Sequence, residues 1–322
     1  MLLEVKNLKT SFFTKLGEVE SVRDVSFEID KNEILGVVGE SGSGKSITSK
    51  SIMKLIEKPG KILDGEIIFE DKNLINLSEK EMRTIRGKEI AMIFQDPMTS
   101  LNPLVKISKQ MSEIIVRHKK ISKKQARQES IEMLRLVGIP NPETRIDSYP
   151  HEFSGGMRQR VCIAMAMSLS PKLLIADEIT TALDVTIQSQ ILNLIKQLNK
   201  KDRNSTILIT HDLNVVHKIC DRVMVMYGGM IMESASIDEI FKNPKHPYTR
   251  GLLNSIPDKD NKVKKRLTPI QGTPPNLLNP PKGCPFYDRC QVSKPICNEM
   301  KPQTKEISNT HKVNCFNLDE VK

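Results

Sequence analysis

A chain of 322 residues is long enough for about two domains with a sizeable core. Trp is absent and aromatic residues make up only 4% of the chain, so Ile, Leu, Val and Met must build that core. The net charge of +10 suits nucleic acid or an anionic membrane surface. Lys and Arg are spread along the chain without interleaved aromatic residues, so the charge alone selects neither.

Two features of the sequence predict the compartment. The first residues, Met1 to Lys6, carry charge where a signal peptide needs an apolar run. Apolar stretches stay well short of the roughly 20 residues that cross a bilayer. We therefore expect a cytosolic chain that meets a membrane only through a partner or a surface, with its six Cys reduced.

Strands predominate among the elements predicted before residue 100. Alternating apolar and polar residues indicate half-buried strands at 2–8 and 20–29. An apolar run at 33–38 predicts a buried strand, and a helix is expected after it at 47–56. The remaining strands of this part are expected at 66–70 and 90–94.

A glycine-rich loop of the P-loop type joins the strand at 33–38 to the following helix. Such glycines let backbone N–H groups converge on phosphate oxygens at the positive end of a helix. We expect Lys45 to reach the β and γ phosphates and Ser46 to ligate Mg²⁺. The strand before the loop and the helix after it favour a nucleotide site over a chance turn. The loop consists of Gly39, Glu40, Ser41, Gly42, Ser43, Gly44, Lys45 and Ser46.

Helices predominate between about 100 and 170, which we expect to be an inserted subdomain. Ser122 and Gln125 have the spacing of a capping box at a helix start. Farther on, Ser154, Gly155 and Gly156 precede another helical run, which is expected from Met157 to Leu169. A hydroxyl and two glycines there are either a simple N-cap or a second anion site. A second anion site would serve a dimer in which each nucleotide lies between two chains.

Strand signals return at 172–176, 206–210 and 222–226, with a helix at 186–200 between them. Strands that alternate with helices predict a mainly parallel sheet. The first of these strands leads into Asp177 and Glu178. Downstream of a P-loop, we expect Asp177 to hold Mg²⁺ and Glu178 to orient and deprotonate the attacking water.

Together these motifs resemble those of ATP-binding-cassette ATPases over roughly residues 2–245. The loop at 39–46 is similar to the Walker A motif, 173–178 to Walker B, and 154–157 to the signature loop, although many members have Gln at the position of Met157. The resemblance implies an α/β fold with an N-terminal antiparallel β subdomain, a helical insert and an irregular Cys-containing C-terminal domain. It also implies that the nucleotide is ATP.

The same resemblance implies roles for four further residues. Gln95 would sense Mg²⁺ and contact transmembrane subunits, and His211 would contact the γ-phosphate. Asp184, in the segment 182–184, would lie at the dimer interface. Phe12 would stack on adenine, with the neighbouring Phe13 as the alternative. Taken singly, His211 could be an ordinary strand-end histidine and Gln95 a loop amide.

A narrower resemblance is to the ATPases of dipeptide and oligopeptide importers. It is carried by the segments 149–151, 155–161 and 243–249, and Met157 favours the D-type subunit over its F-type partner. It implies an F-type ATPase, two transmembrane permease subunits and an extracytoplasmic binding protein as partners, no nucleic acid, and a place at the cytoplasmic face of the membrane. The alternatives are a nickel or metal-chelate importer ATPase and a soluble cassette ATPase that acts on nucleic acid.

Periodicity is lost after about residue 245, so we predict domains at 1–245 and 246–322, with 258–266 as a solvated linker. The second domain contains four Cys with the spacing C-x5-C-x6-C-x17-C. Clustered thiols in a reducing compartment suggest a metal, although this spacing fits neither a zinc ribbon nor the common ferredoxin patterns. The family's cysteine-bearing tail leads us to expect a [4Fe–4S] cluster, with Zn²⁺ or four free thiols as alternatives. The four residues are Cys284, Cys290, Cys297 and Cys315.

Overall fold

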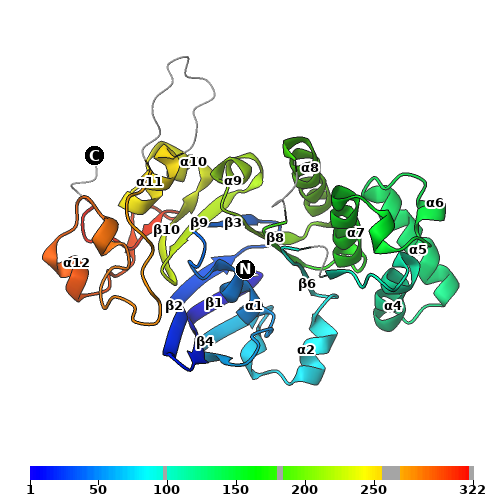
Figure 1. The fold of residues 1–322 in the computed structure, drawn as a ribbon, viewed down its shortest axis with the longest axis horizontal. Coiled ribbons are helices and arrows are strands. Elements are labelled where there is room, and N and C mark those ends of the chain that lie inside the picture. The colour runs from blue at the N-terminus through cyan, green and yellow to red at the C-terminus, as the bar shows by residue number, and fades with distance from the viewer. Residues whose placement is uncertain (97–99, 180–183, 256–268, 319–322) are drawn as a thin grey trace, which may run out of the picture. The chain divides into compact units, whose positions relative to one another are not determined.

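The structure, a computed structural model, describes residues 1–96, 100–179, 184–255 and 269–318. Its chain divides into two compact units (Figure 1). The first unit combines residues 1–75 with 210–322, and the second consists of residues 76–209. Among the described residues, no helix is both long and apolar enough to pass through a bilayer.

An antiparallel sheet near the N-terminus belongs to the first unit. Its strand order is β2 (Gly17–Ile29), β1 (Leu3–Thr14), β4 (Gly60–Phe69) and β5 (Lys72–Asn73). The first strand runs six residues beyond its predicted end because Thr10 and Ser11 are polar but buried, which conceals the alternation. The Thr10 hydroxyl lies 2.9 Å from that of Ser51 in the neighbouring helix. This sheet confirms the antiparallel subdomain predicted from the sequence.

A second set of strands in this unit is ordered β11 (Lys305–Glu306), β12 (Lys312–Val313), β10 (Met230–Ser236), β9 (Arg222–Tyr227) and β3 (Ile34–Val38). Strand β3 is buried along its whole length and runs parallel to β9. Helix α1 (Lys45–Ile52) follows β3, and α9 (Leu213–Ile219) contacts it. Helix α1 ends four residues earlier than predicted, because Lys54 has a left-handed φ of 48°.

The C-terminal part of the chain has more regular structure than the sequence predicted. It contains α10 (Ile237–Lys242), α11 (Pro247–Asn254) and α12 (Pro295–Glu299). The two-residue strand β12 pairs with β10, so the tail rejoins the sheet of its own unit (Figure 1, red). Strands this short produce no periodicity, which explains why the sequence did not indicate them.

The second unit contains a parallel sheet in the order β8 (Ser205–Ile209), β7 (Leu173–Asp177) and β6 (Ile90–Ile93). The predicted capping box at Ser122 is confirmed, because its hydroxyl accepts from the Gln125 N–H and the Gln125 side chain accepts from the Ser122 N–H. The α/β class with a helical insert is also confirmed. The α-helices in the described residues of this unit are α2 (Glu79–Ile85), α4 (Ile107–Lys119), α5 (Lys123–Leu136), α6 (Pro142–Arg145), α7 (Gly155–Met167) and α8 (Val185–Asp202).

Candidate nucleotide-binding site

The glycine-rich loop between β3 and α1 is shaped by close backbone contacts. A Cβ at Gly39 would lie 2.1 Å from the Met226 carbonyl oxygen, and one at Gly44 would lie 2.6 Å from the Ser21 carbonyl oxygen. Gly44 also has a left-handed φ of 99° and is the N-cap residue of α1. Only glycine satisfies both constraints without a shift of the neighbouring backbone. The loop is therefore held in shape by strands β2 and β9.

Lys45 lies inside this loop. Its side chain folds back so that Nζ donates to the Gly39 carbonyl at 2.8 Å and to the Glu40 carbonyl at 2.9 Å, and lies 3.3 Å from the Ser43 hydroxyl. Only 5% of the residue is exposed. The turn thus contains a fixed positive charge at the start of a helix, which is the arrangement a phosphate cradle needs.

The two predicted catalytic carboxylates lie at the end of β7, in the second unit. Asp177 is 4% exposed, and Glu178 follows it with a left-handed φ of 47°. Such a backbone conformation is uncommon for a residue with a side chain. The Glu178 N–H donates to the Ile209 carbonyl of β8 at 3.0 Å, which fixes the turn.

Gln95 lies beside Glu178. Its side-chain N–H donates to a Glu178 carboxylate oxygen at 2.7 Å. Strands β6 and β7 are parallel and in register at Ile93 and Ala176, so both residues follow at the same edge of the sheet. The sequence singled out the two residues separately, and the structure brings them together.

The serine-glycine loop at 154–157 is exposed at its first two residues. Ser154 is the N-cap of α7, and its hydroxyl accepts from the Met157 N–H at 3.3 Å. A Cβ at Gly155 would meet nothing within 4 Å, whereas one at Gly156 would lie 3.0 Å from the Ile187 side chain. The N-cap interpretation is confirmed, and the surface above Gly155 is open within this unit.

Asp184 also caps a helix. Its carboxylate accepts from the N–H groups of Thr186 and Ile187 at the start of α8, at 3.0 and 2.9 Å. Ala182 and Leu183, which precede it in the predicted dimer-interface loop, lie outside the described residues. The capping contact shows how Asp184 is oriented, and its role at an interface stays a prediction.

His211 and the candidate adenine-stacking rings belong to the first unit. The Thr210 N–H donates to the Val37 carbonyl at 3.1 Å, so His211 follows near the end of β3, where the P-loop begins. Phe12 packs on Gly60, where a Cβ would lie 2.7 Å from its ring. Phe13 is 43% exposed, and Lys61 Nζ lies 5.7 Å from its ring centroid. The choice between the two rings stays a prediction.

The four tail cysteines line one small cavity together with His246. Burial raises the pKa of the Cys284 thiol to about 12 and also raises the pKa of Cys290 and of Cys315. In the described ranges, no group of three or more His, Cys, Asp or Glu side chains is arranged to hold a metal ion. The predicted [4Fe–4S] cluster and the alternative Zn²⁺ site are therefore not shown by this arrangement of side chains, and both stay predictions.

Contacts between the tail and the P-loop were not predicted from the sequence. The Glu40 carboxylate accepts from Arg289, and the Glu40 N–H donates to the Tyr248 hydroxyl. These partners are 249 and 208 residues away along the chain. Tyr248 belongs to the segment 243–249 that resembles peptide importer ATPases, but the sequence of that segment does not indicate its contact with Glu40. Contacts over such distances along the chain leave no local pattern.

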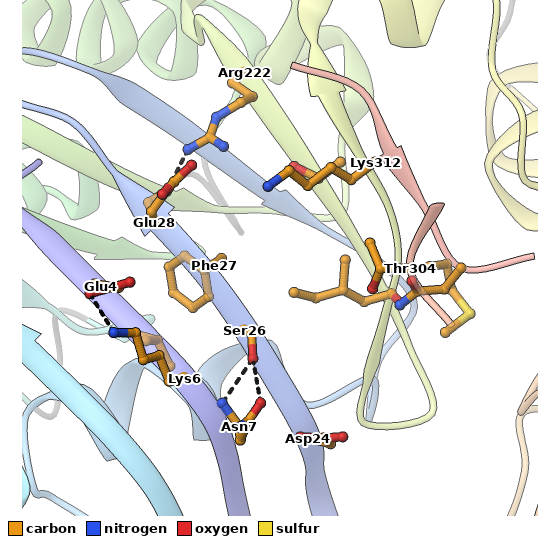
Figure 2. A pocket seen from close by; sticks show the side chains of 15 residues that line it. Glu4, Lys6, Asn7, Asp24, Ser26, Phe27, Glu28, Arg222, Thr304 and Lys312 are labelled. Atoms are coloured by element: carbon orange, nitrogen blue, oxygen red, sulfur yellow. Dashed lines mark hydrogen bonds and ion pairs between the residues drawn. The ribbon is translucent and has the colours of Figure 1, made fainter. Parts of the chain in front are cut away.

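A pocket of about 330 Å³ elsewhere in the first unit contains none of the motif residues (Figure 2). Several of its charged and polar side chains interact within the unit. Lys6 lies 3.0 Å from Glu4, and Ser26 donates to Asn7 at 3.1 Å. Arg222 contacts the Glu28 carbonyl. None of these contacts involves the P-loop, which stays the candidate site of this unit.

Comparisons with known proteins agree with these motifs. The ABC transporter family profile matches residues 22–181. A second profile, the C-terminal region of oligopeptide/dipeptide transporters, matches residues 232–297. Among solved structures, the chain is similar to the ATP-binding cassette MJ0796 in a dimeric post-hydrolysis state bound to ADP and Pi, with a TM-score of 0.67 and 26% identity, over 73% of this chain and 99% of that one.

Curated relatives extend the similarity to nearly the whole chain. The oligopeptide transport ATP-binding protein OppD of Bacillus subtilis is 58% identical over 98% of this chain and 89% of its own length. The dipeptide transport ATP-binding protein DppD of the same organism is 53% identical over 99% of this chain and 95% of its own. Similarity at this level shows that the chain belongs to the ATP-hydrolysing subunits of ABC transporters, in the group with the oligopeptide/dipeptide transporter C-terminal region.

Proposed function

We propose that the chain is the ATP-hydrolysing subunit of an importer that takes up di- or oligopeptides through partner transmembrane subunits. The observation that carries this proposal is the near full-length identity with peptide transport ATP-binding proteins, including the C-terminal region at 232–297. A nickel or metal-chelate substrate is the alternative, because the solute is bound by other subunits of such an importer.

In this proposal the P-loop and Lys45 hold the nucleotide phosphates. Ser46 and Asp177 are the residues that would hold Mg²⁺, which neutralises charge on the phosphate oxygens when bound. Glu178 orients the attacking water and accepts its proton. The hydrogen bond from Gln95 orients the Glu178 carboxylate, so a change at Gln95 is transmitted to the base.

The remaining groups contact the nucleotide from other positions. His211 contacts the γ-phosphate, and an aromatic ring at Phe12 or Phe13 stacks on the base. The loop at 154–157 contacts the nucleotide held by a second cassette, and Asp184 lies at the same interface. The exposure of Ser154 and Gly155 supports this role, as does the dimeric state of the similar MJ0796 cassette.

The partners follow from the type of transporter. The second cassette is an F-type homologue, and the pair docks on two permease subunits at the cytoplasmic face of the membrane. An extracytoplasmic binding protein delivers the solute. Residues 1–245 form the nucleotide-binding domain and 246–322 the C-terminal domain. The separate profile matches at 22–181 and 232–297 support two parts of this kind.

A metal site at Cys284, Cys290, Cys297 and Cys315 is a further part of the proposal. The four thiols line one cavity, which supports it, although their present arrangement does not form a metal site. A [4Fe–4S] cluster predicts brown, anaerobically purified protein with about four irons per chain. Zn²⁺ predicts a colourless protein with about one zinc. The site would be ruled out if metal analysis found neither iron nor zinc and all four thiols were alkylated in the native protein.

The transport function is tested with the complex of this chain, its second cassette and the permease subunits in proteoliposomes. Peptide-loaded binding protein should stimulate ATP hydrolysis and drive uptake. Glu178→Gln should retain ATP binding and lower turnover at this site by roughly a hundredfold to ten-thousandfold, because it removes the base. Stimulation by a nickel chelate but not by peptide would favour the alternative, and unchanged hydrolysis in the variant would refute the role of Glu178.

A further inference from the structure

Arg289 of the tail makes a direct contact with the P-loop. Its Nη1 donates to both carboxylate oxygens of Glu40, at 3.0 and 2.8 Å, and to the Tyr227 hydroxyl at 3.0 Å. The Arg289 side chain is 6% exposed and that of Glu40 is 25% exposed. A charge pair so shielded from solvent is held more strongly than an ion pair on the surface.

The Arg289 guanidinium is fixed on all sides by its own unit. It lies over the rings of Tyr227 and Phe286, with centroids at 5.6 and 5.8 Å. Its Nε donates to the Gln271 carbonyl at 2.8 Å, and its Nη2 donates to the Ile270 carbonyl at 3.2 Å. The contact to Glu40 is therefore made by a preorganised group and not by a mobile surface side chain.

The backbone of Glu40 is held by the same region. Its N–H donates at 2.9 Å to the hydroxyl of Tyr248, a fully buried residue of α11. The rings of Tyr227, Tyr248 and Phe286 pack together, with centroids 4.6 to 5.3 Å apart. A chain with only 4% aromatic residues thus places three of them behind one P-loop residue.

Glu40 is in turn a partner of Lys45. The Glu40 carbonyl accepts from Lys45 Nζ at 2.9 Å and from the Ser43 N–H at 3.2 Å. A displacement of Glu40 would therefore move an acceptor of the lysine that binds phosphate. Contacts to its side chain and its N–H both come from residues in the range 232–297, outside the ABC transporter profile match.

We propose that Arg289 and Tyr248 are positioning residues for ATP binding, through which the C-terminal region sets the shape of the P-loop at Glu40. The inference rests on the P-loop being the ATP site, but not on the solute that is transported. The competing interpretation is that the contact only attaches the tail to the rest of the unit. The two interpretations differ in what happens to nucleotide affinity when the contact is removed.

The test measures binding of a fluorescent ATP analogue, TNP-ATP, with Mg²⁺ to the full chain. Arg289→Gln should raise its Kd about tenfold, because a charged, shielded hydrogen-bonded pair is lost. Arg289→Lys should give an intermediate value. Lysine keeps the positive charge but lacks the planar guanidinium, which donates several hydrogen bonds and stacks on the rings. In the assembled complex, KM for ATP should rise with kcat largely unchanged, because neither residue touches the reacting atoms.

Two further variants isolate the pair. Glu40→Gln should raise the Kd to a similar degree, and adding Arg289→Gln to it should have little further effect, as expected for partners in one interaction. His311→Gln is the matched control, because His311 fastens the tail through Glu233 at 2.7 Å without contacting the P-loop. It should make the tail easier to cleave by protease and leave the Kd unchanged.

An unchanged Kd in Arg289→Gln, together with easier cleavage of the tail, would overturn the proposal and assign the contact to tail attachment. If that variant does not fold, Tyr248→Phe serves instead, since it removes only the hydroxyl that accepts from Glu40. It should raise the Kd by a smaller factor, and no change would equally overturn the proposal. A wild-type chain that fails to bind TNP-ATP would refute the assignment of the ATP site and not this inference.

Discussion

The P-loop and the loop at 154–157 both lead from glycine into a helix, and the structure builds them differently. In the P-loop, Gly44 has a left-handed φ and no room for a Cβ beside the Ser21 carbonyl, and Lys45 is buried within the turn. In the second loop, Ser154 caps its own helix and Gly155 has open space around it. The first loop is braced by several strands and by the tail, whereas the second is capped by its own serine and packs at Gly156 near Ile187 of α8.

This difference shows that two similar sequence patterns can encode different kinds of anion site. A braced loop with an internal lysine has its geometry and charge in place before the nucleotide arrives, which lowers the entropic cost of binding. An exposed helix start offers backbone N–H groups but has no lysine inside its turn, so it binds weakly unless something else holds the ligand. Such a difference is what the proposed dimer requires, since one cassette would bind the nucleotide and a second cassette would complete the site.

The largest expected difference between the two loops is in how much a substitution at their glycines destabilises the chain. Gly44→Ala should lower the free energy of unfolding by about 3 kcal/mol, because it combines a left-handed φ with a Cβ only 2.6 Å from a carbonyl oxygen. Gly155→Ala should change it by less than about 0.5 kcal/mol. Urea denaturation of the two variants measures both values, and similar losses would contradict the comparison.

The next largest effect should be on nucleotide affinity, which we expect to depend on the P-loop lysine. Lys45→Ala should weaken binding of an ATP analogue to the purified chain by about a hundredfold, because it removes the charge that lies inside the P-loop. Lys50→Ala, in the same helix α1, is the control and should bind as the wild type does. Fluorescence titration provides the measurement. Wild-type affinity in the Lys45 variant would show that the P-loop is not the principal phosphate site.

The second loop should matter only when a partner is present. Gly155→Val should leave nucleotide binding by the purified chain unchanged, because its side chain points into open space within the unit. In the assembled complex it should lower ATP turnover about tenfold, since backbone donors at a reacting phosphate would be obstructed. Steady-state hydrolysis with and without the second cassette tests this. Wild-type turnover of the variant in the complex would show that the loop does not act at the interface.

The smallest effect concerns how the tail is attached. Hydrogen bonds from Ser308, Thr310 and Ser236 outweigh the opposing effect of burial and lower the pKa of Glu239 to about 2. This contribution to stability is present above the ordinary pKa of 4.5 and is lost as the pH falls toward 2. Solvent screening limits it to about 1 kcal/mol. Glu239→Gln should reduce the difference between the free energies of unfolding at pH 5 and pH 2. Acid denaturation of the variant and the wild type measures this difference.

Short-range features were predicted well because they depend on neighbouring residues. Strand β3 and helix α8 lie within two residues of their predicted bounds. The capping box at Ser122 needs only one residue three positions farther on. Failures occurred where distant residues decide, as in the extension of β1 to Thr14, which depends on pairing with β2 and β4.

By itself, the sequence determined the chemistry of the site: a lysine and glycines in one loop, two adjacent carboxylates after a strand, and a serine-glycine helix start. These are local patterns, because each motif folds within one turn or one strand end. Tertiary structure alone decided that Gln95 contacts Glu178, across 83 residues, and that Arg289 contacts Glu40, across 249. The physical reason is that such contacts form only when sheets and buried rings bring distant segments together, and no spacing in the chain records that.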